Sequence, residues 1–298
     1  MKRILLTTTS LVLAAGVAQA DVSFSGKGEV SVAQADGTES MSVLSGYDLN
    51  VAVSGASDNG ITYSMGFDMG AGDLIDYNDD YEIDPQLSPV GTSALTIGYA
   101  GVTIVVGQNE VDDLYDDQQN GDVGISGSFG SLNFSAVADT DDGASSNSFS
   151  LSGSADAITW SFVTTDNNAE VTEDDDGVAD DTLDNSGESA SKVTVGLTVS
   201  DALSLSFKHD TKGSSADAVN TLGATYAMGS VTLGLSGADD DTTDYSVGYA
   251  AGPLSVAFAT DESDNWEFNS TYNLGGGAQA FVSTNSTEFA AIGMSFAF

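Results

Sequence analysis

Residues 288–298, which end the chain, read EFAAIGMSFAF. Successive side chains of a β-strand point to opposite faces, so a strand here places Ile292, Met294, Phe296 and Phe298 in one apolar row. Between these residues, the opposite face carries only glycine, serine and alanine. The apolar row requires an apolar environment. Because the same alternation recurs along most of the chain, the sequence predicts a protein built from many such strands.

The composition excludes several classes of protein. The chain has 298 residues, 45 of them acidic and 6 basic, with a formal net charge of -39 and no cysteine. Disulfides and thiolate metal sites are therefore excluded. Nucleic acid is excluded as a partner because Lys and Arg are needed to displace the counterions of a phosphate backbone. Hydrophobic residues make up 41% of the chain, which argues against a disordered acidic protein.

The first residues have the organisation of a secretory signal peptide. Lys2 and Arg3 precede an apolar run that is too short for a transmembrane helix, and residues 18–20 read AQA, a small-x-small cleavage site. We therefore expect residues 1–20 to be a cleaved signal peptide, and residues 21–298 to be a single exported domain.

The connections between the predicted strands alternate in length. Short turns rich in Gly, Ser and Asp lie at 57–60, 100–101, 130–131, 156–157, 201–202, 229–230, 252–253 and 275–277. Longer acidic loops lie at 70–92, 109–122, 139–146, 166–189 and 212–217. This rhythm predicts an all-β fold: a closed up-and-down antiparallel transmembrane β-barrel of 16–18 strands, with short periplasmic turns and long acidic extracellular loops.

A soluble β-sandwich would also alternate. The polar faces of these strands, however, are rich in Gly, Ser and Thr and contain few of the Lys and Glu residues expected on a solvated sheet. The barrel therefore explains the pattern better.

The charged residues within the predicted strands share one register. When the apolar rows are assigned to lipid, the charges that face the lumen are Lys27, Glu29, Asp48, Asp68, Lys192, Lys208 and Glu267. A basic side chain on the lipid face near the midplane would cost about 2–4 kcal/mol, and an acidic one somewhat less. Barrels of sixteen to eighteen strands enclose an aqueous channel, so we expect a polar, water-filled lumen.

The chain resembles the Gram-negative general porins, most closely the Rhodobacter-type porins of alphaproteobacteria. The resemblance rests on YNLGGGA at 272–278, GMSFAF at 293–298, VSFSG at 22–26 and DLY at 113–115. It implies a homotrimer in the outer membrane of a Gram-negative bacterium, in contact with lipid. It also implies that Phe298 is the signal recognised by the outer-membrane assembly machinery.

The same resemblance implies a constriction. In these porins the third loop folds into the pore as an acidic wall, opposite a wall rich in arginine. The counterpart here is residues 109–122, with the carboxylates Glu110, Asp112, Asp113, Asp116 and Asp117. The mature chain has no arginine, so carboxylates dominate the lumen. We therefore expect a porin, not an enzyme, through which ions and small hydrophilic solutes diffuse passively with a preference for cations.

One alternative is an acidic, calcium-associated structural or adhesive surface β-protein. Calcium prefers clustered carboxylates, and Asp174, Asp175 and Asp176 are the candidates. The run fails as an EF-hand loop because Thr172 would occupy its first position. A solvated charge run is the commoner explanation, so we expect no cofactor beyond loosely bound Ca²⁺.

A hydrolase is the remote alternative. His209 is the only histidine and is followed by Asp210. Adjacent residues of a strand point to opposite faces, so this aspartate is poorly placed to orient the imidazole for catalysis.

Overall fold

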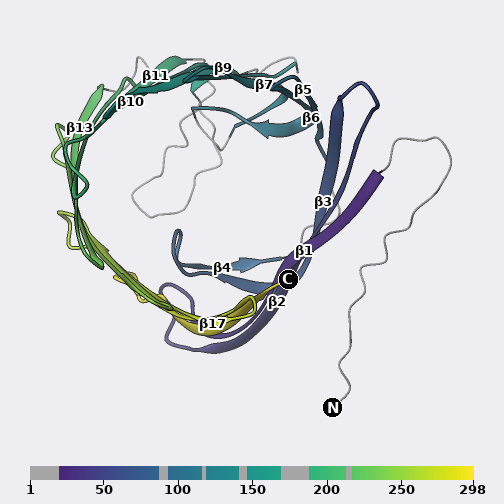
Figure 1. The fold of residues 1–298 in the computed structure, drawn as a ribbon. Helices are drawn as coiled ribbons and strands as arrows, with labels where there is room; N and C mark the ends of the chain where they lie inside the picture. The colour runs from purple at the N-terminus through teal and green to yellow at the C-terminus, as the bar shows by residue number, and fades with distance from the viewer. Residues whose placement is uncertain (1–19, 87–92, 116–118, 141–145, 169–187, 213–216) are drawn as a thin grey trace.

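The wall of the protein is a single antiparallel sheet that closes on itself (Figure 1). The computed structural model describes residues 20–86, 93–115, 119–140, 146–168, 188–212 and 217–298. β1 pairs with both β2 and β19, which closes the barrel. The wall has 18 strands, and one further strand, β4, pairs with β3 inside the barrel. The predicted all-β barrel is therefore confirmed, at the upper end of the predicted strand number.

The strands follow one another around the wall in chain order. Their bounds are β1 Ala20–Gln34, β2 Ser42–Ala56, β3 Thr62–Asp76, β4 Glu82–Pro85, β5 Leu95–Tyr99, β6 Val102–Asp112, β7 Asn120–Phe129, β8 Leu132–Ala138, β9 Asn147–Ala155, β10 Ile158–Asn168, β11 Glu188–Thr198, β12 Leu203–Asp210, β13 Val219–Met228, β14 Val231–Ala238, β15 Thr243–Ala251, β16 Leu254–Thr260, β17 Trp266–Gly275, β18 Ala278–Asn285 and β19 Ala290–Ala297. Among the described residues, no helix is long and apolar enough to cross a membrane.

Short turns join the strands at one end of the barrel, as the sequence predicts. β13 and β14 are joined at 229–230, and β15 and β16 at 252–253. Gly229 and Gly252 adopt φ values of 64° and 59°, the left-handed region that tight hairpin turns require and that glycine adopts without steric cost. Phe298 exchanges backbone hydrogen bonds with Gly26, so the C-terminus joins the wall at this same end.

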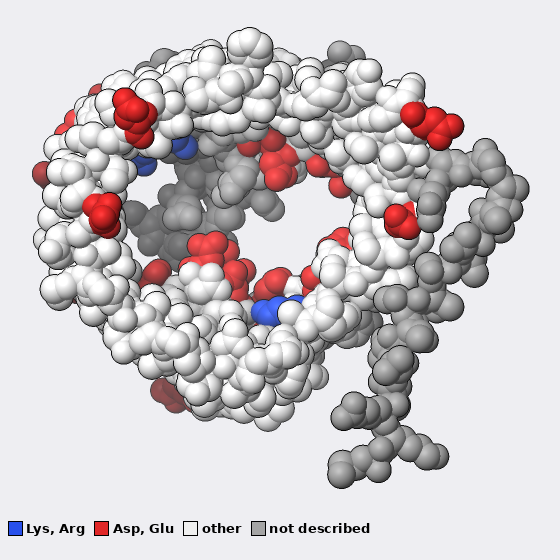
Figure 2. Space-filling model, viewed as in Figure 1, with Lys and Arg blue, Asp and Glu red and all other residues white. Residues whose placement is uncertain are grey.

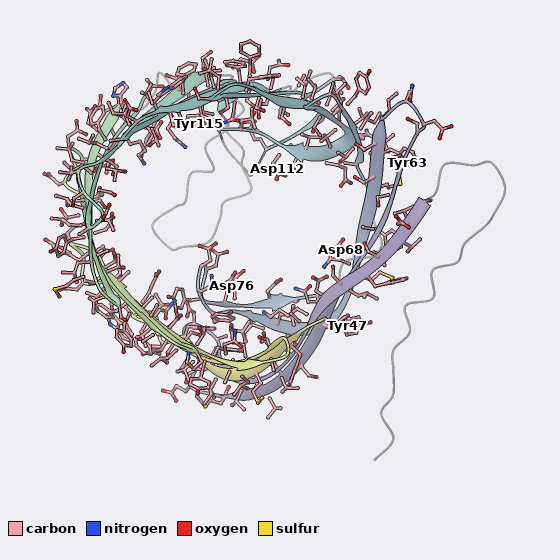
Figure 3. The ribbon with its side chains drawn as sticks, viewed as in Figure 1. Tyr47, Tyr63, Asp68, Asp76, Asp112 and Tyr115 are labelled. Atoms are coloured by element: carbon pink, nitrogen blue, oxygen red, sulfur yellow. The ribbon has the colours of Figure 1, made fainter. Side chains whose placement is uncertain are left out.

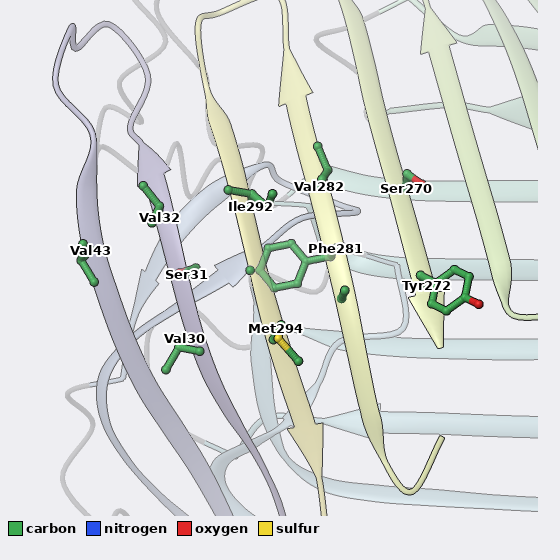
Figure 4. Close-up of a pocket in the computed structure, with 12 residues that line it drawn as sticks. Val30, Ser31, Val32, Val43, Ser270, Tyr272, Phe281, Val282, Ile292 and Met294 are labelled. Carbon is green, nitrogen blue, oxygen red and sulfur yellow. The ribbon is translucent and has the colours of Figure 1, made fainter. Parts of the chain in front are cut away.

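The apolar rows of the strands face outward. Phe24, Ile292 and Phe298 expose 65%, 57% and 65% of their surface, which is far more than a soluble core would permit. Figure 4 shows part of this outer surface, a shallow apolar groove of about 480 Å³ across β1, β18 and β19. The predicted assignment of the apolar rows to lipid therefore matches the fold.

The prediction of a long acidic loop over residues 70–92 is wrong for residues 70–86, the part that the structure describes. β3 continues to Asp76, leaves the wall and pairs with β4, so that residues 73–85 form a hairpin inside the barrel (Figures 1 and 3). Gly72, at the bend, has a φ of 78°, and a Cβ there would overlap the carbonyl oxygen of Ser45. Only glycine fits this bend without strain. We call residues 73–85 the lumen hairpin.

The lumen hairpin supplies the main apolar core of the described residues. Its Ile75 and Tyr81 pack with Phe281, Phe289 and other residues of the inner wall; the full buried cluster is Ala33, Ile75, Tyr81, Phe281, Phe289 and Ala291. The core of this protein therefore lies between the hairpin and one side of the wall, which comprises β1, β18 and β19.

Candidate functional site

The candidate site is the lumen, and strand pairing places charged residues on its inner face. Directly paired residues of neighbouring strands share a face. Lys27 pairs with Asp48, and Asn50 pairs with Asp68, so these side chains all face inward with Glu29. Figure 3 places Asp68 on the lumen side of β3 and Tyr63 on the outer side. On β17, Glu267 shares the face of Thr271, which pairs with the inward Phe281.

Lys27 and Glu29 form an ion pair beneath the lumen hairpin. Lys27 Nζ lies 2.9 Å from Glu29 Oε2 and 5.5 Å from the centroid of the Tyr77 ring. Glu29 Oε1 accepts a hydrogen bond of 2.9 Å from the backbone N–H of Ile75, and the Glu29 side chain is buried. This pair therefore joins β1 to the hairpin and adds no net charge to the lumen.

Two tyrosines anchor the lumen hairpin to the wall. Tyr77 stacks on Phe281 with a centroid distance of 4.7 Å, and its hydroxyl accepts a hydrogen bond of 2.6 Å from Gln279. The hydroxyl of Tyr81 accepts a hydrogen bond of 3.0 Å from Asn269, and burial raises the pKa of Tyr81. Buried stacked aromatic pairs with satisfied hydroxyls hold a defined geometry, so the hairpin is a fixed part of the lumen.

The lumen hairpin is strongly acidic. Its charged residues are Asp73, Asp76, Asp79, Asp80, Glu82 and Asp84, with no Lys or Arg among residues 73–85. Figure 2 shows acidic side chains gathered inside the opening of the barrel, and Figure 3 places Asp76 on the hairpin inside the lumen. Burial, then the neighbouring carboxylates Asp80, Asp84, Asp76 and Asp36, raise the pKa of Glu82. The carboxylates are therefore close enough to repel one another.

Both ends of the predicted constriction loop, residues 109–112 and 120–122, belong to strands. β6 runs to Asp112 and β7 starts at Asn120. We call the residues between these two strands, 113–119, loop three. Glu110 and Asp112 are exposed ends of β6, and Figure 3 places Asp112 on the lumen side. The predicted residues Asp116 and Asp117 lie outside the described residues.

The first residues of loop three are hydrogen-bonded to the wall. Asp113 is buried and accepts hydrogen bonds of 2.8 Å from Ser146 Oγ and 2.7 Å from the backbone N–H of Tyr115. The N–H of Leu114 donates to Ser148 Oγ at 2.9 Å. The Asp113 carboxylate is therefore occupied in holding the loop and is not presented to solute.

Tyr115 forms a cluster with Lys192 and Asp210 on the inner wall. The Tyr115 hydroxyl donates a hydrogen bond of 2.5 Å to Asp210 Oδ1. Lys192 Nζ lies 4.5 Å from the centroid of the Tyr115 ring and 3.9 Å from Asp210 Oδ2. Lys208 is paired with Thr194, which shares a face of β11 with Lys192, so Lys208 also faces the lumen. Lys192 belongs to β11, which is nine strand positions from β1 in either direction around the wall, so this Tyr115 cluster lies opposite the Lys27–Glu29 pair.

Several rim carboxylates bind the backbone of a neighbouring hairpin, which the sequence did not predict. Asp239 accepts hydrogen bonds of 2.7 Å from the N–H and 2.6 Å from the side-chain amide of Asn220. Asp166 likewise accepts hydrogen bonds from the backbone N–H and the side-chain amide of Asn147. The Asn220 side chain lowers the pKa of Asp239. The shared spacing of 19 residues between the partners was the available sequence signal.

His209 Nδ1 lies 2.8 Å from Asn220 Oδ1, whereas Asp210 faces inward to Tyr115, so the two point apart, as predicted. The calcium candidates Asp174, Asp175 and Asp176 and the predicted signal peptide, up to residue 19, lie outside the described residues. Among the residues that the structure describes, no group of three or more His, Cys, Asp or Glu side chains is arranged to hold a metal ion.

The chain is similar to known proteins of one kind. Residues 7–292 match the family model described as Gram-negative porin. Among solved structures, a double mutant of Rh. blastica porin is 16% identical, with a TM-score of 0.52, covering 93% of this chain and 100% of that chain.

Two proteins of Acinetobacter baumannii have a similar fold. OccAB4 is 12% identical with a TM-score of 0.53, covering 94% of this chain and 98% of its own. OccAB1 is 10% identical with a TM-score of 0.57, covering 94% and 96%. No curated protein sequence is significantly similar to the chain. At these identities the structural matches establish the fold.

Proposed function

This chain belongs to the Gram-negative porin family and forms an outer-membrane channel, and on that premise we propose that ions and small hydrophilic solutes cross it by passive diffusion, with a preference for cations. The observation that carries the proposal is the separation of surfaces. Apolar rows cover the outside of the barrel, while Lys27, Asp48 and Asp68 share the inner face. Such a barrel is stable in lipid and leaves a polar path through its middle.

The charge balance of the lumen supports the cation preference. Against Asp48, Asp68, Glu267 and the six carboxylates of residues 73–85 stand Lys27, Lys192 and Lys208. Glu29 pairs with Lys27, and Asp210 lies beside Lys192. Rings and walls of carboxylate select cations in channels because they replace part of the ion's hydration energy and raise the local cation concentration.

We assign the predicted constriction residues two roles. Glu110 and Asp112, with Asp116 and Asp117, contribute negative charge to the wall from which loop three arises. Asp113 instead positions the loop, because its carboxylate is buried and hydrogen-bonded. The expected homotrimer, the loosely bound Ca²⁺, the cleavage of residues 1–20 and the role of Phe298 as an assembly signal remain parts of the proposal.

Single-channel recording in a planar bilayer tests the function. The purified protein is inserted into a bilayer that separates two KCl solutions of different concentration. It should give ohmic channels whose reversal potential has the cation-selective sign. A reversal potential of the opposite sign would contradict the cation preference. A folded barrel without any conductance would instead favour the structural surface protein. A heat-dependent shift in gel mobility establishes folding in either case.

A further inference from the structure

We propose that the lumen hairpin, residues 73–85, is the principal cation filter of this pore, and that loop three is the secondary element. The inference rests on the proposed channel function and names the residues that set its selectivity. It departs from the sequence-based expectation, which placed the constriction at residues 109–122 and treated residues 70–92 as an external loop.

The position of the lumen hairpin is the first observation. After Gly72 the chain leaves the wall and crosses the inner faces of several strands. It contacts β1 through Glu29, β18 through Gln279 and β17 through Asn269. Glu29 and Asn269 lie within their strands, and Gln279 is the second residue of β18, near the short turns, so none of the three is at a long-loop end. The hairpin therefore narrows the lumen from one side along the path of every solute.

The fixed geometry of the lumen hairpin is the second observation. Tyr81 is 4% exposed and Ile75 is 2% exposed, in a cluster with Phe281 and Phe289. The backbone N–H of Gln86 returns to the carbonyl of Gly72 at 2.8 Å and closes the base of the hairpin. A side chain held by a packed core keeps its charge in one place, and fixed charges act on a passing ion without reorganisation.

The third observation is the difference in charge between the lumen hairpin and the opposite wall. The lumen hairpin presents exposed Asp79, Asp80, Glu82 and Asp84, and the nearest lysine, Lys27, is paired with Glu29. On the opposite wall the positive charge of Lys192 lies on the Tyr115 ring and beside Asp210. A cation crossing between the two sides is drawn toward the hairpin, and an anion is repelled by it, since clefts with walls of one sign concentrate counterions.

The described residues of loop three contribute less free charge. Their one carboxylate, Asp113, is 5% exposed and accepts hydrogen bonds from Ser146 and Tyr115. Its negative charge is therefore partly compensated by fixed donors. The carboxylates of the lumen hairpin face open lumen and repel one another, a repulsion that a cation relieves.

The test compares two triple variants with equal loss of charge. The lumen variant carries Asp79→Asn, Asp80→Asn and Glu82→Gln. The control carries Asp58→Asn, Asp201→Asn and Asp264→Asn, which are exposed residues of turns and loops outside the lumen. Both are measured as single channels in a KCl gradient. We expect the cation-to-anion permeability ratio to fall about threefold or more in the lumen variant and to change little in the control.

Each outcome of this experiment is decisive. An unchanged ratio in conducting lumen-variant channels would overturn the proposal, as would an equal fall in the control. A wild-type protein without conductance would refute the channel function itself, which is a separate result. If the triple lumen variant does not show the heat-dependent mobility of a folded barrel, the single variant Asp79→Lys serves instead. It should reduce the ratio more than Asp112→Lys on β6, and the reverse order would overturn the proposal.

Discussion

The lumen hairpin and loop three both enter the barrel from its long-loop side, but different forces hold them. The hairpin is attached by a buried apolar cluster that includes Phe281, together with hydrogen bonds to Glu29, Gln279 and Asn269. Loop three is attached by hydrogen bonds of Asp113 and Tyr115 and by the contact of the Tyr115 ring with Lys192. Apolar burial involves no ionisable group and is not weakened by charge screening, whereas charged contacts depend on ionic strength and on pH. The lumen hairpin, which alone has an apolar cluster, should therefore depend less on ionic strength than loop three.

Removal of the apolar anchor of the lumen hairpin should have the largest effect on the pore. Phe281→Ala deletes the ring on which Tyr77 stacks, and a buried Phe→Ala change typically costs about 3–5 kcal/mol. We expect the lumen hairpin to detach, the single-channel conductance to rise and the urea midpoint of the detergent-solubilised barrel to fall.

Phe296→Ala is the matched control. Phe296 lies on the outer face and is 44% exposed, so its loss should leave the conductance unchanged. Equal conductance in both variants would show that the hairpin does not narrow the pore.

The bend at Gly72 gives the next largest effect. Gly72→Ala places a Cβ against the carbonyl oxygen of Ser45 at a φ of 78°, and a strained backbone of this kind costs about 1–3 kcal/mol. We expect a lower temperature for the gel-mobility shift. Gly28→Ala is the control, because a Cβ at Gly28 meets no atom within 4 Å. Equal shifts in the two variants would contradict the assignment of Gly72 as the hinge.

Loss of the Tyr115 hydroxyl should loosen loop three. Tyr115→Phe removes the hydrogen bond to Asp210, and hydrogen bonds to charged groups contribute about 1.5–3 kcal/mol. We expect open-channel noise to increase at low salt, with little change in the urea midpoint. Tyr226→Phe, on the exposed outer face, should have no such effect. A quiet Tyr115→Phe channel would mean that other contacts suffice to hold the loop.

The smallest expected effect is a difference between the pH at which the lumen hairpin loses charge and the pH at which the rim contacts are lost. The pKa of Glu82 is raised, first by burial, so its charge is unfavourable above that pKa and the penalty is relieved as pH falls through it. The pKa of Asp239 is lowered, first by the Asn220 side chain, so its contribution to stability persists until pH falls through the lowered pKa. On acidification, the reversal potential should therefore change before protease begins to cut the loop at residues 239–242. Cleavage of this loop at a pH above the one at which the reversal potential changes would contradict the prediction.

Some parts of the site were foreseeable from sequence, and others had a signal that went unused. The inward positions of Lys27, Asp48 and Asp68 follow from alternation alone. The lumen hairpin had a signal too, because Ile75, Tyr77, Tyr81 and Ile83 alternate with carboxylates inside the stretch predicted as a loop. Phe281 was a second signal, since a phenylalanine in phase with Gln279 and Ser283 is out of place on a polar face.

The sequence by itself determined the barrel: its turns, its apolar exterior and the strand register. These features are local, because the period of two and the turn residues act within a few positions of one another. Only the tertiary structure decided which segment narrows the lumen. That choice depends on contacts between residues far apart in the chain, such as Tyr77 with Gln279 at a separation of 202 and Tyr115 with Asp210 at 95. A local pattern contains no information on such pairs, because they exist only once the wall has closed.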